Sequence, residues 1–405
     1  MAASSAEPTA SGTGALPPVL PEGTRLLHIG PPKTGTTSLQ AAFWAGRDAA
    51  LAQGVRYAGS SRHSSKAVLA VTGRKSFAED RATPDIRHWN QLLGEIREAR
   101  EPRVVLSSEG FAYASDEARD RVIADLDADR VHVVVTLRPI PNLLASEWQE
   151  HTQSGLRVPF EDWLHELFNQ PESRIARAFW HRQRHDRLIE RWSVPVGVER
   201  VTAVVVDERD HAWLFRAFEA LTGLREGTLV PDTSLANRSL TLEEIVAIRA
   251  LAERFEAEGL SMAAFHRVAR MKLAAYMKQR RPGPGEARIE TPQWALDRAG
   301  EVAEEVVAGI AGMGARVIGD LASLTAVPRS GLEGDRLPEV AVSPEIAAWM
   351  AMGAVVAGNL AATTAARPGS GPSADLASVP SRRLARTLAG RARRFVTRRL
   401  RRRAS

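Results

Sequence analysis

The stretch Leu27–Gln40, LHIGPPKTGTTSLQ, decides the fold of this chain. It reads as the end of an apolar strand, a Gly/Pro turn and a run of hydroxyl residues that begins a helix. Backbone N–H groups at a helix N-terminus are unpaired and lie at the positive end of the helix dipole, so they bind anions. Gly35 lets the backbone approach an anion closely, and Lys33 adds a positive charge. We therefore predict an anion-binding loop built from Lys33, Thr34, Gly35, Thr36, Thr37 and Ser38.

The order of residues in this loop differs from the common nucleotide P-loop. That motif, G-x-x-x-x-G-K-[ST], places its lysine after the second glycine and next to a hydroxyl that binds Mg²⁺. Here Lys33 precedes Gly35. The chain has five lysines among its 54 Lys and Arg residues, so a basic residue in this chain is usually arginine and a lysine at this position is unusual. A compact ammonium group is therefore indicated at this position.

Short apolar runs recur along the first part of the chain, at 25–29, 54–58, 103–108, 130–137 and 200–206. Such runs are typical of strands buried on both faces. Helical segments between them predict βαβ units, and hence a parallel sheet covered by helices. We predict an α/β fold with a P-loop-like sheet of about five strands. After about residue 232 the pattern predicts no further strand, but a mainly helical C-terminal extension with helices at 239–259, 261–279 and 291–322.

The predicted domain organisation follows the composition. It comprises a disordered leader at 1–23, an α/β core at 24–235, helices that complete the core at 236–345, an apolar Ala/Gly-rich helix at 346–366, and a linker with a basic tail at 367–405. The apolar segment carries no charge over its whole length and is long enough to be weighed as a membrane span. Its Ala and Gly content would make insertion unfavourable, so a helix outside the membrane is the favoured interpretation.

Charge and cysteine content narrow the classes of function. The net charge is +6, but residues 381–405 contain 11 arginines and no acid, so the rest of the chain is acidic overall. No specific nucleic-acid partner is therefore predicted. The tail predicts either attachment to an anionic membrane surface or a solvated segment. The absence of cysteine excludes disulfides and thiolate metal sites, and a reducing compartment fits it. We expect a cytoplasmic protein, with peripheral membrane attachment as the second expectation.

A second phosphate-binding pattern lies in VVVTLRPIPNLLASEWQEH, residues 133–151. Arg138 stands at the carboxyl end of a predicted strand, and Ser146 follows eight residues later in a predicted helix. The forked guanidinium group can grip a terminal phosphate, and the serine can donate a hydroxyl to the same group.

These two motifs together resemble those of sulfotransferases that use 3′-phosphoadenosine 5′-phosphosulfate (PAPS). GPPKTGTTSLQ is similar to their 5′-phosphosulfate loop, P-K-[ST]-G-T-T, and the Arg138–Ser146 pair is similar to their 3′-phosphate motif. One departure is R-P-I-P at 138–141 in place of R-D-P. The resemblance covers roughly residues 25–245 and points to bacterial members of the carbohydrate- or heparan-sulfate-acting type. It implies PAPS as co-substrate, PAP as product and no required metal.

The resemblance also assigns two further residues. Glu109, in VVLSSEGFA at 104–112, matches the general base that family members place after a strand, a Glu in the carbohydrate-acting ones. Arg238, in ANRSLTLEEI at 236–245, matches a stretch that could reach the nucleotide or the acceptor, but capping of the following helix is the favoured interpretation. Asp116 and Glu117 compete with Glu109 but read as the first turn of a helix.

The sequence thus predicts transfer of a sulfuryl group from PAPS to an acceptor hydroxyl by in-line displacement, with Lys33 and Glu109 as catalytic residues. The expected acceptor is a sugar, a glycolipid or a secondary metabolite. A P-loop kinase or NTPase acting on ATP is the main alternative, because it shares the fold and the position of the loop. A noncatalytic surface-binding protein that works through its basic tail is the third.

Overall fold

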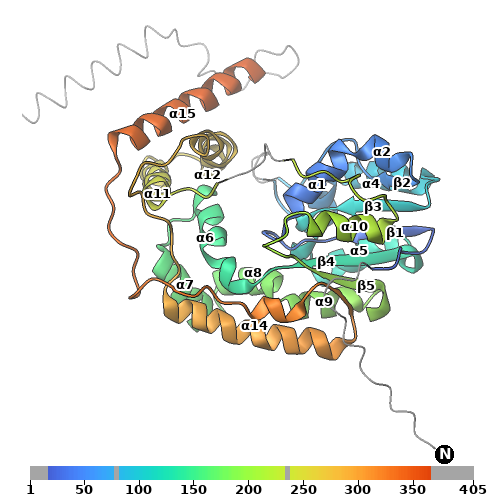
Figure 1. The fold of residues 1–405 in the computed structure, drawn as a ribbon. Helices are drawn as coiled ribbons and strands as arrows, with labels where there is room; N and C mark the ends of the chain where they lie inside the picture. Colours follow the sequence, from blue (N-terminus) through green and yellow to red (C-terminus); the bar gives the residue numbers. More distant parts are fainter. Residues whose placement is uncertain (1–16, 77–81, 233–237, 366–405) are drawn as a thin grey trace, which may run out of the picture.

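The computed structural model describes residues 17–76, 82–232 and 238–365 (Figure 1). The first 16 residues of the predicted leader lie outside this range, as do the predicted linker and basic tail at 367–405. The fold class is confirmed: a parallel sheet of six strands is flanked by helices and followed by a mainly helical C-terminal part (Figure 1).

The strands run in the order β2-β3-β1-β4-β5-β6, and every pair is parallel. Their bounds are β1 (Thr24–His28), β2 (Val55–Tyr57), β3 (Arg103–Ser107), β4 (Val131–Leu137), β5 (Val201–Val205) and β6 (Arg316–Ile318). Strands β1, β4 and β5 are buried along their full length, as strands of a sheet covered on both faces must be.

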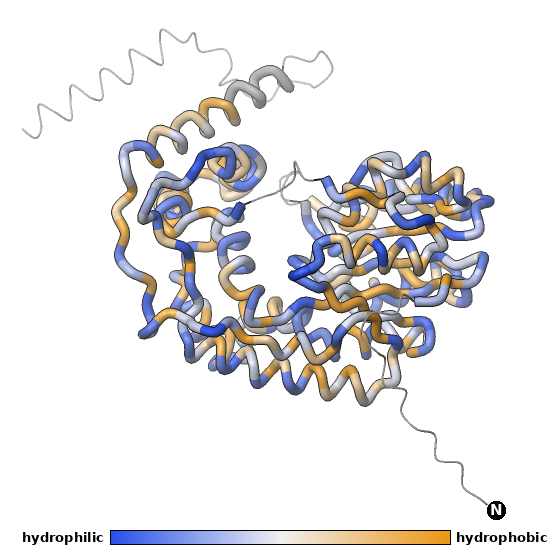
Figure 2. The backbone as a smooth tube through the Cα atoms, viewed as in Figure 1, coloured by the Kyte–Doolittle hydropathy of each residue, from blue (hydrophilic) through white to orange (hydrophobic). Residues whose placement is uncertain are grey.

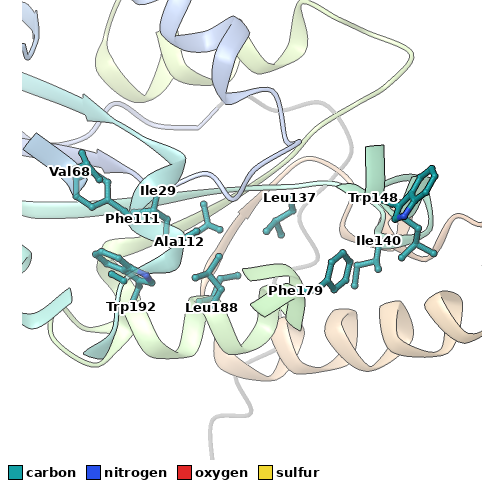
Figure 3. Packing of buried hydrophobic residues seen from close by; sticks show 14 of the residues in the cluster. Ile29, Val68, Phe111, Ala112, Leu137, Ile140, Trp148, Phe179, Leu188 and Trp192 are labelled. Carbon is teal, nitrogen blue, oxygen red and sulfur yellow. The ribbon is translucent and has the colours of Figure 1, made fainter. Parts of the chain in front are cut away.

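Helices cover both faces of the sheet. Successive residues of each strand point to opposite faces and pack against different helices. On one face Leu26, Val134 and Val204 pack against α1 (Thr36–Ala45), α2 (Arg47–Leu51) and α10 (Trp213–Thr222). On the other face lie α3 (Ser65–Val71), α4 (Arg87–Glu98), α5 (Asp116–Asp125), α8 (Arg174–Gln183) and α9 (His185–Ser193). Figure 3 shows Phe111 and Trp192 in this second core, where their rings meet edge to face at 6.3 Å.

The remaining helices are α6 (Leu144–Gln153), α7 (Phe160–Asn169), α11 (Leu242–Ala257), α12 (Met262–Val268), α13 (Ala274–Met277), α14 (Gln293–Met313) and α15 (Pro344–Ala365). Of these, α6, α7, α11, α12 and α15 lie to one side of the sheet, whereas α14 runs beneath α8 and α9 (Figure 1). Hydrophobic residues concentrate on the strands and on the buried sides of the helices, as Figure 2 shows. Among the described residues, no helix combines the length and hydropathy that crossing a bilayer requires.

The prediction that strands stop after residue 232 is wrong, because β6 adds a sixth strand beside β5. The predicted helix at 291–322 ends instead at Met313, where Gly314 adopts φ +71° and terminates α14. The chain then turns back to the sheet with Arg316–Ile318. Two helical segments between the strands are interrupted: Gly46 separates α1 from α2, and Arg184 separates α8 from α9.

Candidate active site

The candidate site lies at the carboxyl edge of three adjacent strands. The anion loop follows β1, Glu109 follows β3, and Arg138 follows β4, with β1 paired to both of its neighbours. In an open α/β sheet, ligands bind at this edge, where the crossovers diverge to the two sides. The topology therefore brings the three predicted segments to one place.

The anion loop has the backbone that its sequence indicates. Lys33 adopts φ +71°, and Gly35, the N-cap of α1, adopts φ +89°. A Cβ at Gly35 would come 2.7 Å from Leu214 Cδ2, so both conformation and space require glycine there. No side chain caps the N-terminus of α1, and its first amides are left for an anion.

The hydroxyl residues of the loop divide into two groups. The Thr34 hydroxyl is buried; it donates to the Pro31 carbonyl at 2.7 Å and lies 2.5 Å from the Thr136 hydroxyl. Thr36 is also buried, whereas Thr37 and Ser38 are exposed. Thr34 thus fixes the loop to β4, and the exposed pair has hydroxyls open to a ligand.

Lys33 is engaged by an acid that the sequence analysis did not single out. Its Nζ lies 2.5 Å from Oε2 of Glu150 on α6, and Arg270 binds the other oxygen of the same carboxylate. Arg270 also donates to the Ser154 hydroxyl at 2.7 Å. Burial alone would raise the pKa of Glu150, but Lys33 and Arg270 outweigh it and hold that pKa at about 2. Glu150 is therefore ionised and holds both cations in place.

Arg270 comes from the C-terminal helical part, on a π-helical turn, η6 (Ala269–Leu273), between α12 and α13. Such turns occur frequently at functional sites. Lys278, eight residues after Arg270, is half-buried, and the charges of Lys33, Glu150 and Arg270 act on it. Burial and the charges of Lys33 and Arg270 lower the pKa of its ammonium, whereas Glu150 opposes this. Two cations therefore bind this carboxylate and a third lies near it, and the excess positive charge suits an anionic ligand.

Glu109 opens a 3-10 turn, η1 (Glu109–Tyr113), directly after β3. A Cβ at Gly30 would come 2.9 Å from Glu109 Cβ, so the turn that leads into the anion loop is in direct contact with the base candidate. The Glu109 Oε2 atom is buried and has no hydrogen-bond partner among the described residues. Burial raises the pKa of this carboxyl, Glu150 adds to the rise, and Arg270 and Lys33 oppose it. A carboxylate with a raised pKa is the stronger base.

Arg138 extends from the end of β4 and is held by Glu208, which follows β5. Its Nε donates to Glu208 Oε1 at 2.5 Å, and the Asn142 amide donates to both oxygens of the same carboxylate. Arg138 also donates to the Lys33 carbonyl at 3.4 Å, which brings it to the anion loop. Ser146, in the first turn of α6, donates its hydroxyl to the Leu143 carbonyl at 2.9 Å.

Arg238 is committed to structural contacts. It forms a two-pronged ion pair with Glu244 at 2.7 and 2.8 Å and donates to the carbonyls of Met277 and Arg280. Glu244 in turn completes a capping box with Thr241 at the start of α11. The capping interpretation thus has direct contacts in its support, and a nucleotide-binding role for Arg238 stays a prediction.

Four residues of this site were missed by the sequence interpretation: Glu150, Glu208, Arg270 and Lys278. For Lys278 a signal existed, because the scarcity of lysine that marks Lys33 applies to it as well. Glu150 lies one helical turn after Ser146 and so shares its face of α6. Arg270 carries no local signal. Among the described residues, no group of three or more His, Asp or Glu side chains is arranged to hold a metal ion.

Several solved structures resemble this chain. The sulfotransferase from Alicyclobacillus acidocaldarius aligns over 60% of this chain and 98% of its own, with 17% identity and a TM-score of 0.38. The sequence matches no family model and no curated protein.

Proposed function

We propose that this protein transfers a sulfuryl group from PAPS to the hydroxyl of an acceptor. One observation carries the proposal: the half-buried Glu109 carboxyl has a raised pKa and an oxygen with no partner among the described residues, and it adjoins the turn that leads into an anion loop whose lysine precedes its glycine. A base beside an anion site is what deprotonation of a hydroxyl next to a transferable anionic group requires.

The residues present fit a nucleotide with phosphates at both ends. Lys33, the uncapped amides of α1, Thr37 and Ser38 would hold the 5′-phosphosulfate, and Arg138 with Ser146 would hold the 3′-phosphate. Arg270 and Lys278 add positive charge near Lys33. Thr34 and Thr36 would contribute through their backbone, since both side chains are buried.

In the proposed reaction, the nucleotide and the side chains of the protein have different roles. The nucleotide supplies an activated sulfuryl group, and an S–O bond to its phosphate breaks as one to the acceptor oxygen forms. Glu109 takes the acceptor proton, a role worth about 10²–10⁴-fold in rate. Lys33 and the α1 amides stabilise the negative charge left on the phosphate oxygen.

Thermal-shift titration separates this proposal from the ATP-dependent alternative. PAP and PAPS should each raise the melting temperature at micromolar concentration, since a ligand that binds only the native state stabilises it. ATP with Mg²⁺ should have a much smaller effect. A larger shift with ATP–Mg²⁺ than with PAP would contradict the proposal and favour a kinase or NTPase.

The acceptor and the tail complete the proposal. We expect a hydroxyl-bearing small molecule or carbohydrate as acceptor and an anionic membrane surface as a partner of residues 381–405. Deletion of these residues should abolish sedimentation with phosphatidylserine vesicles and leave sulfuryl transfer intact. If deletion of the tail also abolished sulfuryl transfer, the tail would instead belong to the catalytic unit.

A further inference from the structure

A second cationic group lies close to Glu109, around the ring of Tyr113 at the end of η1. The Arg74 guanidinium carbon lies 3.7 Å from the centroid of this ring, and that of Arg182 lies 4.5 Å from it. Two guanidinium groups on one phenol ring concentrate positive charge beside the proposed base.

The two arginines differ in how their charge is compensated. Arg182 is buried and pairs with Glu147 at 3.0 Å. Arg74 is half-buried, and no acid within the described part of the chain forms an ion pair with it. Burial lowers the pKa of Arg74, Arg182 adds to the fall, and the Tyr113 and Glu109 charges oppose it. A partly desolvated cation that forms no ion pair within the described residues is stabilised when an anionic ligand binds it.

The position of Arg74 is fixed by its surroundings. Its backbone N–H donates to the Leu69 carbonyl at 2.9 Å and closes the end of α3. Helix α3 approaches η1 closely, because Gly110 has no side chain: a Cβ there would come 2.8 Å from Val68 Cγ1. Figure 3 shows Val68 and Phe111 in this contact. Arg74 is thus held against η1 by packing.

The distance from this group to the base suits a small substrate. A 3-10 helix rises about 2 Å per residue, so Tyr113 lies about 8 Å from Glu109 along the axis of η1. Arg74 packs on the Tyr113 ring and is near enough to Glu109 for that carboxylate to act on its pKa, so an acceptor whose hydroxyl meets Glu109 can reach Arg74 with a group a few bonds away. A guanidinium stacked on an aromatic ring keeps its N–H edge free for two-pronged binding of a carboxylate, phosphate or sulfate.

We infer that Arg74 and Tyr113 form an acceptor subsite that selects hydroxyl compounds bearing an anionic group within about 8 Å of the hydroxyl that is sulfated. The inference rests on the proposed function. It narrows the acceptor from any hydroxyl compound to an acidic one, such as a uronic acid or a hydroxylated carboxylic acid.

Matched pairs of acceptors test this with radiolabelled PAPS. Each pair differs in one carboxylate: methyl β-D-glucuronide against methyl β-D-glucoside, and 4-hydroxyphenylacetate against 4-hydroxyphenylethanol. In at least one pair, the wild-type protein should sulfate the acidic member with a kcat/KM about tenfold or more above that of the neutral one. Arg74→Gln should remove this preference through the KM of the acidic member, with the Kd for PAP unchanged. Arg87→Gln, an exposed arginine on α4, is the control and should retain the preference.

Two further variants keep the inference testable if Arg74→Gln does not fold. Arg74→Lys keeps the charge but not the planar fork and should retain only part of the preference. Tyr113→Leu removes the ring and should reduce it. Provided that PAP still binds, any of three results would overturn the inference. These are equal rates for both members of every pair, no sulfation of either member, and a preference that survives the loss of Arg74. Failure of the wild-type protein to bind PAP would instead overturn the proposed function.

Discussion

The ammonium group of Lys33 lies 2.5 Å from the carboxylate of Glu150, which also binds Arg270. A lysine from the anion loop and an arginine from the C-terminal helices thus share one acid. The acid offsets their charge in the absence of an anion, and it links the loop to the helical part. A bound phosphate or sulfate would compete with Glu150 for both cations.

Replacing this acid should therefore tighten anion binding. In Glu150→Gln the Kd for PAP should fall roughly fivefold, because removal of a nearby negative charge relieves about 1 kcal/mol of repulsion at a solvent-reached site. Turnover should fall as well, since Lys33 loses the group that orients it. Isothermal titration calorimetry measures the first effect, with the exposed Glu117→Gln as control. Weaker PAP binding in Glu150→Gln would show that the carboxylate positions Lys33 and does not compete.

Lys33 itself should matter for turnover more than for affinity. Lys33→Ala removes the charge that stabilises the phosphate oxygen in the transition state, which should lower kcat about 10²–10³-fold. Lys66→Ala, in α3, provides a control outside the proposed site. Steady-state kinetics with labelled PAPS would detect the loss. A kcat within a factor of two of wild type would remove Lys33 from the proposed catalytic residues.

The raised pKa of Glu109 predicts a particular pH dependence. A base must be ionised, so activity should disappear as the pH falls through the pKa of this carboxyl. Because burial raises that pKa, the acid limb of kcat/KM should lie above the range of an ordinary glutamate. Glu109→Gln should lower kcat about 10²–10⁴-fold, remove this limb and leave the Kd for PAP unchanged. Wild-type turnover in Glu109→Gln would exclude it as the base.

Arg138 should contribute to affinity for the nucleotide. Arg138→Ala removes a charged donor to the 3′-phosphate, so the Kd for PAP should rise about tenfold to a hundredfold. Adenosine 5′-phosphosulfate, which lacks that phosphate, should lose little affinity in the same variant. Arg209→Ala is the matched control, because this exposed arginine pairs with Asp207 in the neighbouring loop. An equal loss for both nucleotides would indicate a general effect on the loop.

The fold could be predicted because buried parallel strands appear in the sequence as short continuous apolar runs. The runs at 130–137 and 200–206 correspond to β4 and β5, both wholly buried. Strand β6 has no such apolar run in the sequence. It has three residues, lies at the edge of the sheet and is partly exposed, so its sequence does not differ from that of a helix end. Only its pairing with β5 defines it.

Residues of the candidate site could be predicted only where a local sequence motif marks them. A loop between a strand and a helix has a recognisable pattern, and so Lys33 and Gly35 could be assigned from the sequence. Glu150 and Arg270 reach Lys33, and Arg74 reaches Tyr113, through the packing of helices far apart in the chain. The local sequence does not predict these contacts, because contacts between helices depend on the whole fold; for Glu150 it indicates only that the side chain shares a helix face with Ser146.

The contact between Gly30 and Glu109 gives a last test of how the loop and the base depend on each other. Gly30 adopts φ +81°, and an added Cβ would come 2.9 Å from Glu109 Cβ. Gly30→Ala should therefore cost about 1–2 kcal/mol for the backbone conformation, and a further loss for displacement of Glu109. Gly259→Ala is the matched control, since Gly259 adopts φ +66° and a Cβ there meets nothing within 4 Å. Urea unfolding should show a larger loss of stability for Gly30→Ala, and kcat should fall in that variant alone. Equal losses of stability with unchanged kcat would mean that Glu109 tolerates the displacement.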